Sequence, residues 1–157
     1  RLSLVGSEMC IRDRQYVFAS EEYLEFVDTS FTDVFGFFVN GVNMARVPNS
    51  ATAVSINSIN DATNIEYFVN NNSGTLDTEM DGRTVVLFTF QITVNADVTN
   101  HIKLAIADRG DSAFDSNVFL KAGSFISVRI SFFCAGVACS LARRRQDSAT
   151  ADCPFSV

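Results

Sequence analysis

Hydrophobic residues recur at every second position along much of this chain, which is the period of a β-strand and not of a helix. In residues 84–94 one predicted face is apolar and the other polar: Val86, Phe88, Phe90, Ile92 and Val94 against Thr89, Gln91 and Thr93. Residues 101–108 repeat the pattern, with Ile102, Leu104 and Ile106 inward. We therefore expect two half-buried antiparallel strands, and we expect Asp108 to arrive at the end of the second on its inward side.

Short apolar segments separated by polar turns predict further strands at residues 15–19, 33–40, 53–56, 65–69 and 117–125. The turns contain pairs such as Asn40-Gly41 and Asp81-Gly82, which favour tight reversals of the chain. Only residues 21–27 offer a helical alternative, of one or two turns. No internal repeat is visible. The pattern predicts an all-β protein, an antiparallel β-sandwich that is jelly-roll-like.

The charge of the chain argues against a nucleic-acid partner. Residues 15–125 contain 14 Asp and Glu against 5 Lys and Arg, while the whole chain has a net charge of -6. Affinity for nucleic acid comes mainly from Lys and Arg that neutralise phosphates, so an acidic body disfavours it.

The cysteines and the histidine argue against zinc and against nucleophilic catalysis. Cys10, Cys134, Cys139 and Cys153 all lie outside residues 15–125, and His101 is the only histidine. Structural zinc sites need four such ligands at characteristic spacings, which are missing here. A Cys-His or Ser-His pair would have to use His101, which we expect to be an ordinary strand residue.

Two acidic clusters are the candidate functional residues. Asp108, Asp111 and Asp115 share one glycine-containing loop, and Glu21 and Glu22 follow the first predicted strand. Carboxylates gathered in a loop are the hard oxygen ligands that Ca²⁺ takes, although their spacing is not that of an EF-hand. The sequence thus suggests a calcium site formed by these five residues, provided that strand pairing brings the two clusters together.

Two other interpretations of the acidic clusters stay open. The aspartates can be turn formers that accept backbone amides two residues on. Paired carboxylates can also act as the acid and base of a glycosidase, but the chain has no Trp to form a sugar platform.

Three segments carry a resemblance to a known family. They are YVFASEEY at residues 16–23, FTDVFGFF at residues 31–38, and HIKLAIAD at residues 101–108 with its continuation to residue 120. Over residues 15–125 the chain resembles the choice-of-anchor L domain of secreted and surface-attached bacterial proteins. The resemblance implies an exported, extracellular or cell-surface module that is not an enzyme.

The two ends of the chain differ from the family-like body. Residues 1–14 resemble a translated sequencing-adapter peptide, so we interpret them as a non-native leader and expect the domain to lack its N-terminal strands. In residues 126–157, an apolar run at 130–142 precedes three arginines but is shorter than the roughly 20 residues that span a bilayer. This tail is interpreted as an anchor remnant or as the product of a frame error.

These observations leave three functional hypotheses. The first is a non-catalytic extracellular β-sandwich for binding or adhesion, with Ca²⁺ as a candidate stabilising ion and a glycan or protein as its ligand. The second is a structural spacer or display domain of a larger surface protein attached to the membrane or cell wall. The third is a carbohydrate-active enzyme.

Overall fold

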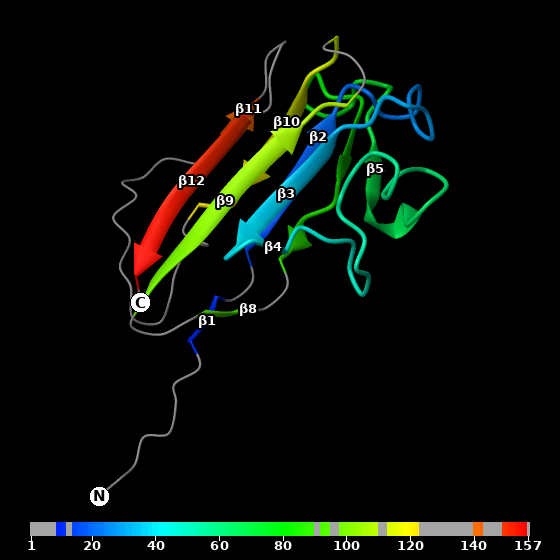
Figure 1. The fold of residues 1–157 in the computed structure, drawn as a ribbon. Helices are drawn as coiled ribbons and strands as arrows, with labels where there is room; N and C mark the ends of the chain where they lie inside the picture. Colours follow the sequence, from blue (N-terminus) through cyan, green and yellow to red (C-terminus); the bar gives the residue numbers. More distant parts are fainter. Residues whose placement is uncertain are drawn as a thin grey trace, which may run out of the picture.

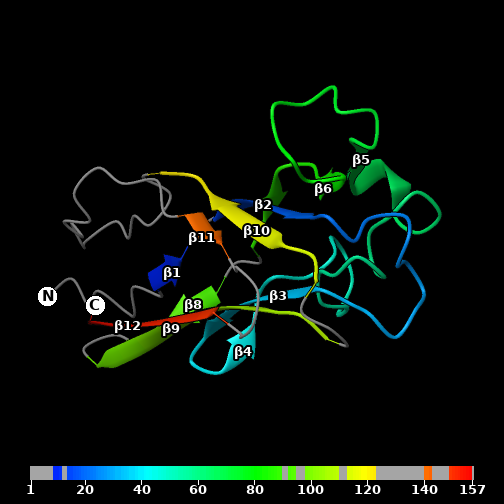
Figure 2. The same cartoon turned by 90° about the horizontal axis from the view of Figure 1, so that it is seen from above.

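The computed structural model describes residues 9–11, 14–89, 92–94, 98–109, 113–122, 140–142 and 149–156. These residues form a nearly all-β molecule in which two antiparallel sheets face each other, as Figures 1 and 2 show from two directions. The prediction of an antiparallel β-sandwich is confirmed.

The first sheet has the strand order β11-β10-β2-β6-β5, and β7 also pairs with β2. Its strands are β2 (Gln15–Ser20), β5 (Phe68–Asn70), β6 (Gly82–Thr84), β7 (Leu87–Phe88), β10 (Ser116–Leu120) and β11 (Ser140–Ala142). A 3₁₀ turn, η1 (Ile65–Tyr67), leads into β5.

The second sheet has the order β12-β9-β3-β4. Its strands are β3 (Val34–Val39), β4 (Val42–Asn43), β9 (Thr99–Ala107) and β12 (Ala149–Ser156). A separate pair consists of β1 (Met9–Ile11) and β8 (Ile92–Val94).

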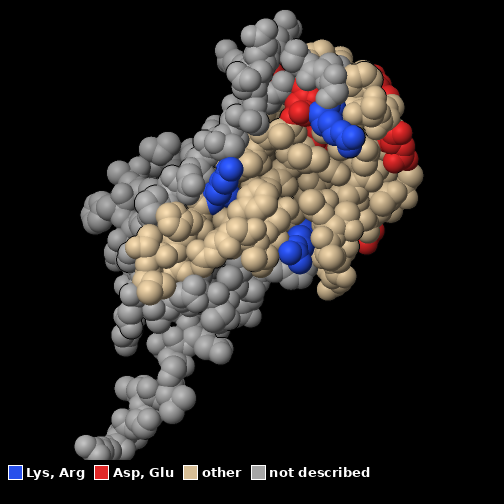
Figure 3. Space-filling view, in the orientation of Figure 1, with Lys and Arg blue, Asp and Glu red and all other residues tan. Residues whose placement is uncertain are grey.

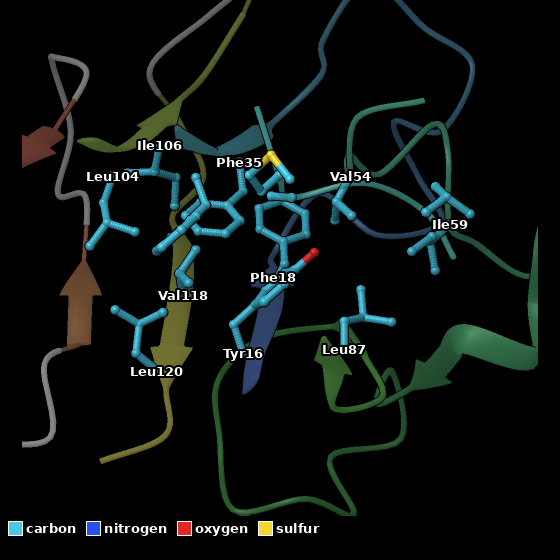
Figure 4. Close-up of a cluster of buried hydrophobic side chains, with 14 of the residues drawn as sticks. Tyr16, Phe18, Phe35, Val54, Ile59, Leu87, Leu104, Ile106, Val118 and Leu120 are labelled. Carbon is cyan, nitrogen blue, oxygen red and sulfur yellow. The ribbon is translucent and has the colours of Figure 1, made fainter. Parts of the chain in front are cut away.

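The core lies between the sheets and is built from alternate residues of four strands (Figure 4). The inward side chains are Tyr16, Phe18, Phe35, Phe37, Val39, Ile102, Leu104, Ile106, Val118 and Leu120. The rings of Tyr16 and Phe35 join the two sheets, with centroids 5.2 Å apart. The alternation predicted for residues 101–108 is therefore confirmed.

The predicted apolar face of residues 84–94 is wrong at Val86 and Phe88, the two of its members whose burial the structure describes. Val86 and Phe88 are each 51% exposed, whereas Leu87 and Thr89 are buried. The register explains the reversal: Ala19 pairs with Arg83 but Tyr16 pairs with Leu87, so the strand beside β2 contains one extra residue between β6 and β7. Such a bulge moves every following side chain to the other face of the sheet.

Smaller differences concern three other predicted elements. Residues 53–56 form two isolated bridges, Val34 with Ser55 and Arg46 with Ala53, instead of a strand. The start of the segment predicted at 65–69 is the 3₁₀ turn η1, and β5 begins at Phe68. Residues 21–27 form turns and not a helix, with one helix-like hydrogen bond from Phe26 N–H to the Glu22 carbonyl (3.2 Å).

The ends of the chain contribute strands in the described parts. β1 lies within the predicted leader, and β11 and β12 lie within the predicted tail. The non-native leader and the anchor remnant or frame error stay predictions. Among the described residues, no helix is long and apolar enough to cross a membrane.

Candidate functional site

Four chain segments converge at one end of the sandwich. In the first sheet, β2 ends at Ser20, which pairs with Ser116 at the start of β10. In the second sheet, β3 begins at Val34, which pairs with Ala107 at the end of β9. Asp33 precedes Val34 and Asp108 follows Ala107, so the register places these two aspartates opposite each other.

Three carboxylates meet at this end. One carboxylate oxygen from each of Glu22, Asp33 and Asp108 lies within 4.8 Å of the other two. Glu22 is 1% exposed and Asp33 is fully buried. Asp108 is half-buried as a residue, but both of its carboxylate oxygens are buried. We call these three residues the carboxylate cluster.

Hydrogen bonds fix the orientation of the carboxylate cluster and connect the two sheets. Asp33 Oδ2 accepts hydrogen bonds from the hydroxyls of Ser116 and Ser20, the latter at 3.4 Å. Ser20 Oγ accepts the Glu22 backbone N–H at 2.9 Å. Glu22 Oε2 in turn accepts the Asp33 backbone N–H at 3.2 Å. Oε2 of Glu22 and Oδ2 of Asp33 are therefore both held by hydrogen bonds from within the protein.

Glu21 and Asp115 form a second arrangement beside the carboxylate cluster. Glu21 Oε2 accepts the Asp115 backbone N–H at 2.9 Å, and the Glu21 backbone N–H donates to the Asp115 carbonyl at 3.0 Å. Oδ1 of Asp115 is buried and has no hydrogen-bond partner among the described residues. We call this two-bond contact the Glu21-Asp115 clasp; it joins the turn after β2 to the segment before β10.

Aromatic rings and one backbone contact hold the same segments together. The ring of Phe26 lies 5.7 Å from Phe31 and 5.2 Å from Phe114, measured between centroids. The Thr32 backbone N–H donates to the Arg109 carbonyl at 3.0 Å. The loops that carry the carboxylates are thus packed against one another.

The residue after Glu22 is fixed by close packing against β5 and β6. Tyr23, which follows Glu22, is buried, and its ring packs against Phe68 with a centroid distance of 4.9 Å. A Cβ atom on Gly82 would lie 2.7 Å from Tyr23 and 2.8 Å from Phe68. Only a glycine at this position allows both rings to lie against β6.

The structure answers only part of the sequence prediction for the metal site. It brings Glu22 and Asp108 together, and it places Glu21 and Asp115 in the neighbouring clasp. Asp111 lies outside the described residues. Whether any of the five binds a metal stays a prediction.

Asp33 is the member of the carboxylate cluster that sequence reasoning missed as a site residue. It stands in the FTDVFGFF segment, at the start of a predicted strand. Its position opposite Asp108 follows only from the β3-β9 register, which is a long-range property of the fold. The sequence feature that could have indicated Asp33 is that Asp33 directly precedes one of the two strands and Asp108 directly follows the other.

Two hollows in the described surface lie away from the carboxylate cluster. A groove of about 420 Å³ is lined by Pro48, Asn49, Tyr67 and residues 85–89. A hollow of about 320 Å³ is lined by Phe38, Gly41, His101 and Lys103. On the face in Figure 3, acidic side chains lie toward the end with the loop before β5, and the surface over the strands is largely uncharged.

Comparison with known proteins assigns the chain to a family. The choice-of-anchor L domain matches residues 13–126, which is most of the chain. The chain belongs to the choice-of-anchor L domain family. No curated protein and no solved structure matches it. The resemblance seen in residues 15–125 is confirmed, and a choice-of-anchor L domain is a surface-associated bacterial module.

Proposed function

We propose that this choice-of-anchor L domain is a non-catalytic binding or adhesion module of the bacterial cell surface, stabilised by a Ca²⁺ ion at Glu22, Asp33 and Asp108. One observation carries the calcium part: three carboxylates from three separate segments converge within 4.8 Å at the end where the two sheets meet. Asp111 and Asp115 remain further candidate ligands from the loop that follows Asp108.

The chemistry and size of the carboxylate cluster favour Ca²⁺ as the ion. Ca²⁺ binds hard oxygen ligands at about 2.3 to 2.6 Å, so two oxygens on one ion are at most about 5 Å apart. The 4.8 Å limit within the carboxylate cluster fits this separation without a large movement. Ionised carboxylates this close repel one another, and a divalent cation between them replaces repulsion by attraction.

The burial of the carboxylate cluster favours a stabilising role for the proposed ion over direct contact with an external ligand. Glu22 and Asp33 are 1% and 0% exposed, so an ion bound by them would lie inside the protein. Such an ion would connect the turn after β2 with the facing ends of β3 and β9, and thereby both sheets. Any binding of a glycan or protein then uses another part of the surface.

The same burial argues against a glycosidase. An acid and a base must face a substrate across an accessible cleft. Neither of the two hollows described above is lined by Glu22, Asp33 or Asp108. This supports a non-catalytic module, in agreement with the type of domain that the family comprises.

Isothermal titration calorimetry of the chelator-treated chain with CaCl₂ tests the ion directly. We expect one saturable binding event, and we expect Asp108→Asn and Glu22→Gln to weaken it strongly. Asp61→Asn is the matched control, because Asp61 is an exposed aspartate outside the carboxylate cluster. Equal heats for all four proteins, or no heat with the wild type, would contradict the calcium site.

A separate experiment distinguishes binding from spacing. The purified chain is applied to a panel of immobilised glycans and to whole bacterial and host cells. Retention on a defined glycan or cell type supports the binding module. The absence of retention, with a folded and calcium-loaded protein, favours the spacer or display domain attached through the rest of the surface protein.

A further inference from the structure

We draw no further inference here: the strongest candidate, the uncharged groove beside β7 with the half-exposed Val86 and Phe88 on its wall, carries nothing because nothing in the structure shows what occupies it.

Discussion

Asp33 directly precedes β3 of the second sheet and Ser116 begins β10 of the first sheet, and the Ser116 hydroxyl donates a hydrogen bond to Asp33 Oδ2. Both residues are buried. Ser20, the register partner of Ser116, donates to the same oxygen. A buried carboxylate is therefore held at the end of the sandwich by hydroxyls from the facing sheet, and Glu22 and Asp108 gather around it.

The Asp108→Asn variant separates a metal site from a hydrogen-bonding network. With Ca²⁺ present, the variant should unfold at a lower temperature than the wild type, because it loses a charged ligand. In excess chelator, the variant should be as stable as the wild type or more stable, because it removes repulsion within the carboxylate cluster. Thermal unfolding of both proteins in both buffers measures the two differences.

One outcome would contradict this prediction. A loss of the same size in Ca²⁺ and in chelator would mean that Asp108 contributes only hydrogen bonds or packing. Asp61→Asn, at an exposed position, serves as the control for a general effect of net charge.

Glu21 should behave differently from the carboxylate cluster, because its side chain accepts a backbone N–H in the Glu21-Asp115 clasp. Glu21→Ala should lower the free energy of unfolding by about 1 kcal/mol, the typical net value of one hydrogen bond. Glu21→Gln keeps an acceptor oxygen and should cost less. Chemical denaturation should give the same loss with and without Ca²⁺, and a loss seen only with Ca²⁺ would make Glu21 a ligand.

Gly82→Ala tests the close packing that holds the turn after β2. The added Cβ would lie under 3 Å from the rings of Tyr23 and Phe68, so both rings must move. Overpacking of this kind costs about 1 to 3 kcal/mol. Because Glu22 precedes Tyr23, calorimetric affinity for Ca²⁺ should also fall; an unchanged stability and affinity would show that the rings yield freely.

The bulge between β6 and β7 makes a prediction about neighbouring residues. Leu87 is buried and Phe88 is 51% exposed. Leu87→Ala should therefore lower the free energy of unfolding by about 2 to 5 kcal/mol. Phe88→Ala should cost less than about 1 kcal/mol despite the larger side chain. Urea denaturation measures the loss in both variants. A larger loss for Phe88→Ala than for Leu87→Ala would contradict the bulge and support the uninterrupted strand that the sequence pattern predicts.

Alkaline titration tests the burial of two tyrosines. Burial raises the pKa of Tyr16 and of Tyr23 above the ordinary value of 10, and neither hydroxyl has a hydrogen-bond partner in the described part of the chain. A raised folded-state pKa contributes stability that is present below pH 10 and is lost at higher pH. Burial also lowers the pKa of Arg14 to about 10, which changes stability with pH in the opposite direction. The shifts of the two tyrosines together are larger than this single shift, so the net effect is a loss of stability at high pH.

The expected result is that the phenolate absorbance of Tyr16 and Tyr23 develops together with the loss of β-sheet circular dichroism. Phe substitutions at positions 16 and 23 assign the signal. Ionisation of both residues at an ordinary pH, in a protein that is still folded, would contradict their burial between the sheets.

The regular part of the fold could be predicted from the sequence, and the irregular part could not. β9 alternates without interruption, so Ile102, Leu104 and Ile106 were correctly expected inside. The strand beside β2 departs from the predicted pattern at the bulge, so Val86 and Phe88 are exposed although the pattern placed them on the buried face. On either side of the bulge, the hydroxyls of Thr84 and Thr89 accept hydrogen bonds from the backbone N–H groups of Phe18 and Arg14. A hydrophobic pattern does not reveal such bonds between a side chain and the backbone of the neighbouring strand.

The candidate site divides in the same way. The inward position of Asp108 follows from local alternation, and the sequence could predict it. The role of Asp33 depends on the register Val34 with Ala107 and on the facing pair Ser20 and Ser116. These are contacts between segments far apart in the chain, and only the folded arrangement of the two sheets reveals them.

The most direct test of the proposed calcium stabilisation is the thermal unfolding of the wild-type chain, first in Ca²⁺ and then in excess chelator. An ion that binds only the folded state adds about 2.7 kcal/mol at a hundredfold excess over its dissociation constant. We expect the unfolding midpoint to rise by several degrees in Ca²⁺ and to return to its lower value when chelator is added. The same midpoint in both buffers, at Ca²⁺ concentrations up to the millimolar range, would contradict the account and leave Glu22, Asp33 and Asp108 as a hydrogen-bonded link between the sheets.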